Sequence, residues 1–201
     1  MSVKWSVIRN FVIKELGADH SGHNHQHAFR VAHNADIILN RENGNRKITM
    51  AAAYLHDCVD QKLFSNPTLQ IDKIRILLKE VNYSDNEIET VINIIQNISY
   101  NNGNYSELTL HEAMITRDAD RLDAIGAIGI VRAIEYGTIK SRSFYSANNK
   151  DPNTTLAHFY NKLLKLEGLM LTATGKELAA ERHKFLLLFI SQFYKELDGQ
   201  I

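Results

Sequence analysis

Apolar residues recur every three to four positions along most of the chain, which is the period of an α-helix with one buried face. Regular alternation of apolar and polar residues, the mark of a half-buried strand, is absent from the sequence. The period predicts helices near residues 3–12, over 72–81, over 88–98 after Ser84-Asp85, and over 109–122, 124–137, 154–166 and 172–197. We therefore expect an all-α protein with about eight or nine helices.

Turn-forming residues separate these segments without marking a domain boundary. Asn-Gly occurs at 43–44 and 102–103, but the flanks are helical, so both pairs predict helix–helix loops rather than hairpins. The sequence has no internal repeat and no Pro- or Gly-rich linker, and a chain of 201 residues can bury its own core. These features predict one domain over residues 1–201.

Charge and composition narrow the range of partners. Lys plus Arg and Asp plus Glu both number 23, so we expect no general attraction to nucleic acid or to an anionic membrane. The densest apolar run, residues 185–190, is far too short to span a bilayer, and the first residues lack a signal-peptide core. Cys58 is the sole cysteine, which favours a reducing compartment. We expect a cytoplasmic protein that binds neither nucleic acid nor membrane.

A histidine-rich stretch, SGHNHQHAFRVAHNA at residues 21–35, is the first candidate for chemistry. If the stretch is helical, His23 and His27 share a face at a spacing of four residues. His25 then points about 160° away from His27, and His33 also lies off that face. At most two of these rings can therefore meet at one point.

A second candidate is AAAYLHDCVDQK, residues 51–62, in which a run of small and apolar residues ends at His56 and Asp57. Such a run predicts a helix packed in the interior. Burying an imidazole and a carboxylate is costly unless each has a partner, and a divalent cation would satisfy both. A hydrogen bond between the two side chains inside the core is the alternative.

Three carboxylates, Asp118, Asp120 and Asp123, lie close together in RDADRLDAIGAIG, residues 117–129. Taken alone, this segment is typical of a solvated helix start in which Asp118 pairs with Arg121. Taken with the histidines and the His-Asp doublet, it completes a mixed set of nitrogen and oxygen ligands. Such a set suits Mn²⁺, Fe²⁺, Co²⁺ or Ni²⁺, and Mg²⁺ less well, whereas structural Zn²⁺ would more usually recruit cysteine.

This arrangement resembles the HD-domain metal-dependent phosphohydrolases, an all-α superfamily with the signature H…HD…D. The likeness extends to HxxRV, LHDxxDxK, DADRLDAIGAIGI, HFYNKLLKLEGLMLT and AxxRHKFL, which together look like a small single-domain bacterial branch. The resemblance implies metal ligands at His27, His56, Asp57 and Asp120, with Asp118 as a neighbouring alternative.

The resemblance also implies a domain plan and a metal. It implies a helical bundle of the HD type, with a metal-site core at about residues 20–140 and C-terminal helices at about 153–198 that complete the bundle. Mn²⁺ is the favoured ion, with Fe²⁺, Co²⁺, Ni²⁺ or Mg²⁺ as alternatives. The expected partner is a small-molecule nucleotide, and the chain is expected to be a monomer or a small homo-oligomer.

The implied activity is hydrolysis of phosphate bonds in nucleotides, since the branch includes nucleoside triphosphate pyrophosphohydrolases. A phosphomonoesterase, a (p)ppGpp hydrolase or a cyclic-dinucleotide hydrolase of the same superfamily is the alternative. Asp60-Gln61 weakens the (p)ppGpp option, because those enzymes carry two consecutive acids there. Outside enzymes, the alternatives are a catalytically silent nucleotide-sensing module and a structural helical protein that binds no metal.

Two residues are candidates for catalysis. Asp60 follows His56 by four residues and could orient the attacking water, or could instead cap the next turn. His23 could donate a proton to the leaving phosphate, or could be an exposed polar residue. The related branch usually has Asp where this chain has Asn24, so an accompanying carboxylate is missing here.

Three cationic residues, Lys62, Lys162 and Arg182, are candidates for binding substrate phosphates. Phosphoryl transfer needs positive charge around the phosphates, which is why basic side chains are expected in the cleft. For each of them the alternative is a solvated side chain on a helix surface.

Overall fold

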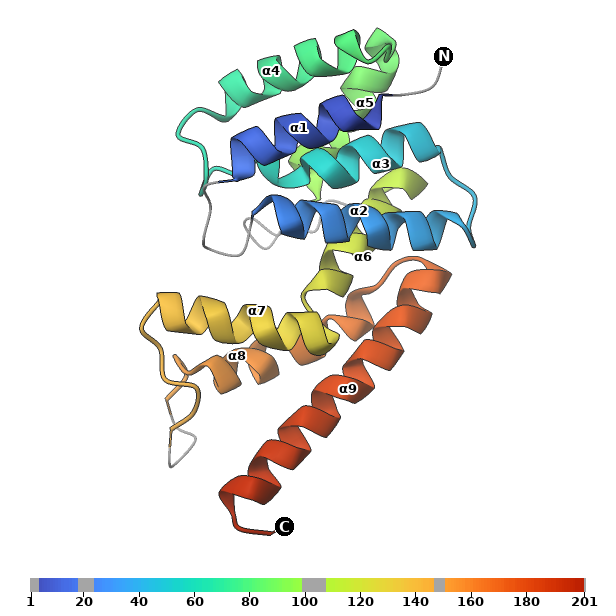
Figure 1. Ribbon diagram of the computed structural model, residues 1–201. Helices are drawn as coiled ribbons and strands as arrows, with labels where there is room; N and C mark the ends of the chain where they lie inside the picture. Colours follow the sequence, from blue (N-terminus) through green and yellow to red (C-terminus); the bar gives the residue numbers. More distant parts are fainter. Residues whose placement is uncertain (1–3, 18–23, 99–107, 147–150, 201) are drawn as a thin grey trace. The chain divides into compact units, whose positions relative to one another are not determined.

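The computed structural model describes residues 4–17, 24–98, 108–146 and 151–200, and within these ranges every regular element is helical (Figure 1). The all-α prediction is therefore confirmed. The chain divides into two compact units, Met1–Asp120 and Arg121–Ile201, and the boundary falls within one helix. No helix in the described ranges combines the length and the apolar character needed to cross a bilayer.

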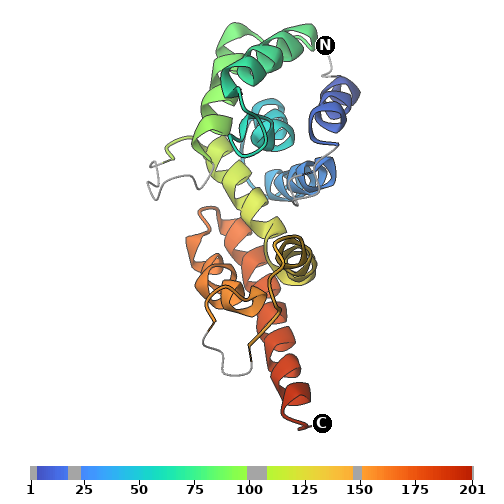
Figure 2. The ribbon, with the colours of Figure 1, turned by 90° about the vertical axis from the view of Figure 1, so that its left-hand side faces the viewer.

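The first unit is a layered group of helices built around α3. Its elements are α1 (Trp5–Leu16), α2 (His25–Leu39), α3 (Arg46–Leu55), the 3₁₀ turn η1 (His56–Val59), α4 (Pro67–Glu80), α5 (Asp85–Asn97) and most of α6 (His111–Asp123). Figure 2 looks nearly along α3 and shows α1, α2 and α5 around it, in agreement with their packing contacts. Ala51, Ala52 and Ala53 are fully buried, and because their side chains are small, neighbouring helices can approach α3 closely.

Local capping chemistry sets where these helices begin. Ser84 and Glu87 form a reciprocal capping box at the start of α5, which confirms the helix expected after Ser84-Asp85. The helix expected over 72–81 begins earlier than predicted. Asn66 accepts the backbone N–H of Leu69 and Pro67 occupies the first turn of α4, a position that proline tolerates well.

The second unit contains α7 (Gly126–Ile139), α8 (Thr155–Asn161), the 3₁₀ turns η2 (Leu163–Lys165) and η3 (Glu167–Leu169), and the long helix α9 (Ala173–Leu197). Within the unit, α7 packs against α8 and α9 (Figure 1). A cluster of phenylalanine rings contributes to its packing: Phe144, itself half-buried, makes edge-to-face contacts with the fully buried Phe159 and with Phe189 and Phe193.

Two predicted boundaries in this unit were wrong. The single helix expected over 154–166 ends at Asn161, because Lys162 has a non-helical backbone (φ −133°, ψ −59°) and the chain continues as 3₁₀ turns that bury Leu163 and Leu166. The helix expected from residue 124 begins at Gly126, whose φ of +73° separates it from α6. A side chain is strained at that φ, and a Cβ there would lie 3.1 Å from the Arg182 side chain.

Candidate metal centre

His56 and Asp57 lie where α3 tightens into the 3₁₀ turn η1 in the interior of the first unit. The exposed fractions of His56 and Asp57 are 3% and 4%, and Cys58 beside them is fully buried. Burial raises the pKa of the Cys58 thiol, and the Asp57 carboxylate raises it further, so the thiol stays protonated at neutral pH. The donors available from this turn are therefore an imidazole nitrogen and carboxylate oxygens.

His27 lies in the first turn of α2 and its exposed fraction is 1%. Asn24 is the N-cap of this helix, and its side-chain oxygen accepts the backbone N–H groups of Gln26 (3.1 Å) and His27 (3.2 Å). Asn and Asp cap helices about equally well, so Asn24 retains the capping function that an Asp would have here. Residue 24 thus fixes the first turn that places His27 toward the interior.

Asp120 comes from α6, and a buried amide on α2 holds this part of α6 in place. The side chain of Asn34 donates to the carbonyl of Ala119 at 3.0 Å, next to Asp120 in the chain. Asn34 is buried among apolar residues of α2, seven residues after His27. It was not among the residues expected at the site, although a polar residue on an apolar helix face is a signal that could have found it.

The four side chains meet at short distances. The Nε2 atom of His27 lies 3.2 Å from Nε2 of His56, 3.5 Å from Oδ2 of Asp57 and 3.3 Å from Oδ1 of Asp120. The Nε2 atom of His56 lies 3.4 Å from Oδ1 of Asp57 and 3.8 Å from Oδ1 of Asp120. Atoms that bind one ion at about 2.1 Å lie roughly 3.0–3.4 Å apart. The separations of 3.2, 3.3 and 3.4 Å fall in this range and those of 3.5 and 3.8 Å are slightly longer, so small shifts would bring all four side chains to a shared ion.

The hydrogen bonding of His56 fixes which ring nitrogen faces this point. Its Nδ1 lies 2.9 Å from the carbonyl oxygen of Ala53. A carbonyl can only accept, so Nδ1 carries the proton and the neutral ring presents the lone pair of Nε2 to the centre. A metal-ligating histidine is commonly oriented in this way by a backbone carbonyl.

The donor set therefore fits a divalent cation. His27, His56 and Asp57 offer ligand atoms that all lie within 4.8 Å of one another, and all three residues are buried. Asp120 adds an oxygen near both imidazoles, and its side chain is 40% exposed. Asp118 is fully buried two residues earlier on α6, where a helical side chain points about 200° away from that of Asp120.

The predicted catalytic residues have different outcomes. His23 lies outside the described residues, so the helix face that it was expected to share with His27 stays a prediction; within the described residues α2 begins at His25. Asp60 is buried directly after η1, and its Oδ1 accepts the backbone N–H of Lys62 at 2.8 Å. This contact caps the next turn, which is the second of the two roles considered for Asp60 from the sequence. It uses one of the two carboxylate oxygens of Asp60.

The three residues predicted to contact substrate phosphates are divided between the two units. Lys62 is exposed in the first unit. In the second unit Lys162 is exposed at the end of α8, and the guanidinium of Arg182 donates to the carbonyl of Leu122. Burial lowers the pKa of Arg182 while Asp123 opposes that shift. The roles of these residues in substrate binding stay predictions.

The fold and the site define an all-α protein with a buried His-His-Asp centre of the kind that holds a divalent metal. Residues 24–125 match the HD domain family, and the chain belongs to that family. The match covers the elements that supply His27, His56, Asp57 and Asp120. The resemblance to the HD-domain superfamily is thereby confirmed.

Relatives match nearly the whole chain. The uncharacterized protein YpgQ of Bacillus subtilis is 37% identical over 96% of this chain and 93% of its own length. A crystal structure of YpgQ in complex with ADP has a TM-score of 0.82 at 35% identity, covering 98% of this chain and 99% of that one. A structure described as an HD-superfamily hydrolase from Bacillus thuringiensis has a TM-score of 0.82 at 36% identity, with 98% and 99% coverage. These findings support a metal-dependent hydrolase.

Proposed function

We propose that the protein is a divalent-metal-dependent phosphohydrolase that releases pyrophosphate from nucleoside triphosphates. The observation that carries the proposal is the convergence of the Nε2 atoms of His27 and His56 with carboxylate oxygens of Asp57 and Asp120. The complex of the relative YpgQ with ADP supports a nucleotide as the substrate class.

The proposed ion is Mn²⁺, because two imidazoles and two carboxylates form a mixed donor set that suits it. A divalent ion supplies an acidified water and polarises a phosphoryl oxygen when it is bound at such a site. The protein holds the donors in place before any ligand arrives, since His27, His56 and Asp57 are buried and His56 is oriented by Ala53. Such preorganisation lowers the cost of reorganising the site during the reaction.

The remaining residues have proposed roles around this centre. Asp60 is held by its turn contact with Lys62, and we assign its second carboxylate oxygen to orienting the attacking water. Lys62, Lys162 and Arg182 are proposed to neutralise substrate phosphates, and His23 is proposed to protonate the leaving group. Because Asp120 is the partly exposed member of the four proposed ligands, we propose that substrate approaches beside it.

The test is a product analysis with purified, untagged protein loaded with Mn²⁺. Nucleoside mono-, di- and triphosphates, (p)ppGpp, cyclic dinucleotides and a phosphomonoester are each incubated, and pyrophosphate is separated from orthophosphate. We expect pyrophosphate from triphosphates, and loss of metal and product together in Asp57→Ala but not in Asp72→Asn, which changes an exposed carboxylate on α4. Bound metal with no product from any of these compounds would contradict the proposal.

A further inference from the structure

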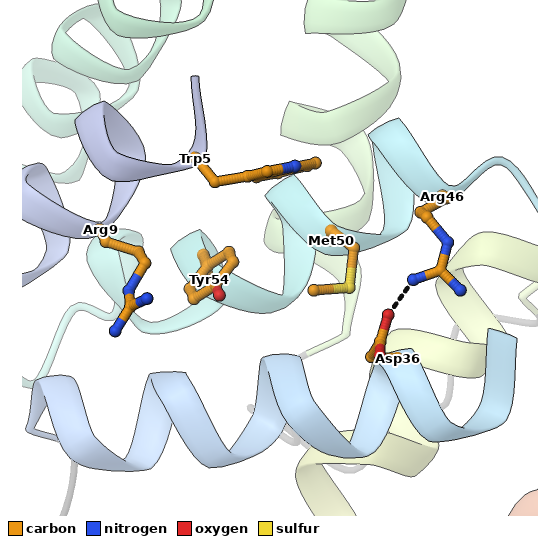
Figure 3. Close-up of a pocket in the computed structure, with 6 residues that line it drawn as sticks. All are labelled: Trp5, Arg9, Asp36, Arg46, Met50 and Tyr54. Carbon is orange, nitrogen blue, oxygen red and sulfur yellow. Dashed lines mark hydrogen bonds and ion pairs between the residues drawn. The ribbon is translucent and has the colours of Figure 1, made fainter. Parts of the chain in front are cut away.

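A groove with a cavity volume of about 320 Å³ lies between α1, α2 and α3 of the first unit (Figure 3). It is lined by Trp5 and Arg9 from α1, Asp36 from α2, and Arg46, Met50 and Tyr54 from α3. The three α3 residues follow one another at intervals of four, so they share one face of the helix. The four proposed metal ligands are not part of this lining, so the groove is a separate site.

Aromatic rings form the walls of the groove. Trp5 lies across it above Tyr54 and Met50 (Figure 3), and the Trp5 and Tyr54 ring centres are 6.2 Å apart at an angle of 38°. The rings of Phe29 and Tyr54 make a T-shaped contact, with 5.8 Å between ring centres. The groove therefore offers half-buried aromatic faces and a flexible thioether, which together suit a planar ring.

The charges of the lining are not balanced. Arg46 forms an ion pair with Asp36 and also donates to Asn40 at 2.6 Å, so its charge is compensated. Arg9 lies over the ring of Phe29, with its guanidinium carbon 4.8 Å from the ring centre. Among the described residues Arg9 has no carboxylate or carbonyl partner, and stacking uses its face and leaves the N–H groups at its edge available.

One further donor at the groove, the hydroxyl of Tyr54, is unengaged in the described part of the chain. A ligand that satisfies this hydroxyl needs an acceptor on its ring, as well as an anionic group for Arg9. Nucleobases carry such acceptors at their edges, and a guanidinium binds phosphate oxygens in pairs. A benzoate-like ring would satisfy Arg9 but offer no ring acceptor to the hydroxyl of Tyr54.

We propose that this groove binds a nucleoside monophosphate, with the base against Trp5 and Met50 and the phosphate at Arg9. The volume lies at the lower end of the range for small-molecule sites, about 300–1,000 Å³, which suits one nucleotide. The proposal is independent of the proposed hydrolase activity, because none of the four proposed metal ligands lines the groove.

Trp5 is the one tryptophan of the chain. Fluorescence excited at the long-wavelength edge of tryptophan absorption therefore reports on the groove directly. AMP is titrated into metal-free protein in EDTA, with N-acetyltryptophanamide as the control for light absorption by the base. We expect a saturable change with a dissociation constant between about 10 μM and 1 mM. Adenosine, which lacks the anion, and ribose 5-phosphate, which lacks the ring, should each bind at least about tenfold more weakly.

Variants assign the signal to the groove. Arg9→Gln should weaken AMP binding at least about tenfold, whereas Arg75→Gln should not, because Arg75 is a partly exposed arginine outside the groove that pairs with Glu89 on α5. Asp57→Asn should leave the titration unchanged, because Asp57 belongs to the metal centre. The absence of a saturable change in correctly folded wild-type protein, equal binding by Arg9→Gln, or loss of binding in Asp57→Asn would each overturn the proposal.

Discussion

The side-chain amide of Asn34 on α2 donates to the backbone carbonyl of Ala119 on α6, at a distance of 3.0 Å and in a buried environment. This bond joins the helix of His27 to the helix of Asp120 one residue away from the carboxylate. His27 and Asp120 come from helices that are far apart in the sequence. The distance of 3.3 Å between Nε2 of His27 and Oδ1 of Asp120 therefore depends on how α2 and α6 are placed against each other. We therefore expect Asn34 to position Asp120 for the proposed metal centre.

Replacing Asn34 by alanine should weaken Mn²⁺ binding by about tenfold, the lower range of effects seen when residues that orient metal ligands are changed. The free energy of unfolding of metal-free protein should fall by about 1 kcal/mol, because one buried hydrogen bond is lost. Calorimetric Mn²⁺ titration and urea unfolding measure the two quantities.

The control is Gln70→Ala, which removes another buried amide, one that bonds to Glu15 at 3.1 Å between α4 and α1. This variant should lose comparable stability but keep its Mn²⁺ affinity. Equal losses of affinity in the two variants would show that Asn34 contributes general stability and not the position of Asp120.

Asp57→Asn should abolish stabilisation by metal while leaving the metal-free protein at least as stable. Without a cation, Asp57 holds a buried carboxylate whose desolvation is costly, and the amide removes that charge. Mn²⁺ at a hundredfold excess over its dissociation constant should stabilise wild-type protein by about 2.7 kcal/mol, or about 5–10 °C in Tm. Thermal unfolding with and without Mn²⁺ tests this, and a similar Mn²⁺ shift in the variant would remove Asp57 from the ligand set.

Helical periodicity was enough to predict the all-α fold, because nearly every helix buries one apolar stripe. It could not locate boundaries that depend on turn chemistry. The residues before 72 in α4 have no clear apolar period, and the helix starts at Pro67 because Asn66 caps it. The break at Lys162 follows from the burial of Leu163 and Leu166 in a tighter turn, which a sequence pattern does not reveal.

The site was predictable to the extent that it rests on motifs. The His56-Asp57 doublet at the end of a small-residue helix pointed to a buried donor pair, and the structure brings His27 and Asp120 to it. The expected pairing of His23 with His27 on one helix face stays a prediction, because His23 lies outside the described residues. The sequence shows Asn34 as a polar residue on an apolar helix face, but it does not reveal the partner, because the contact with Ala119 joins residues 85 positions apart.

Asn24→Asp should leave the free energy of unfolding within about 0.5 kcal/mol of wild type, because both side chains accept the N–H groups of Gln26 and His27. Asn24→Ala should cost about 1 kcal/mol, because it removes the cap from the first turn of α2. Urea unfolding at neutral pH measures both. Equal stabilities of the alanine variant and wild type would mean that the cap does not hold this turn in solution.

Glu87 predicts a pH dependence of stability in the first unit. Its hydrogen bond with Lys47, at 2.7 Å, and the backbone N–H of Ser84 lower its pKa below the ordinary value of 4.5. A lowered carboxyl pKa stabilises the folded state above pH 4.5, and this contribution is lost as the pH falls through the folded-state pKa. Glu87→Gln should therefore be less stable than wild type at pH 7, and the difference should shrink toward zero in acid.

Urea unfolding of both proteins at a series of pH values below 7 measures this difference directly, because the other carboxyl groups are common to the pair. The loss at pH 7 should be about 1 kcal/mol or less, since both partners are partly exposed. Glu89→Gln, which removes a more exposed carboxylate paired with Arg75, should show a smaller loss of stability at pH 7. A difference between Glu87→Gln and wild type that stayed constant down to acid pH would mean that Glu87 stabilises α5 through packing, and that its charge contributes little.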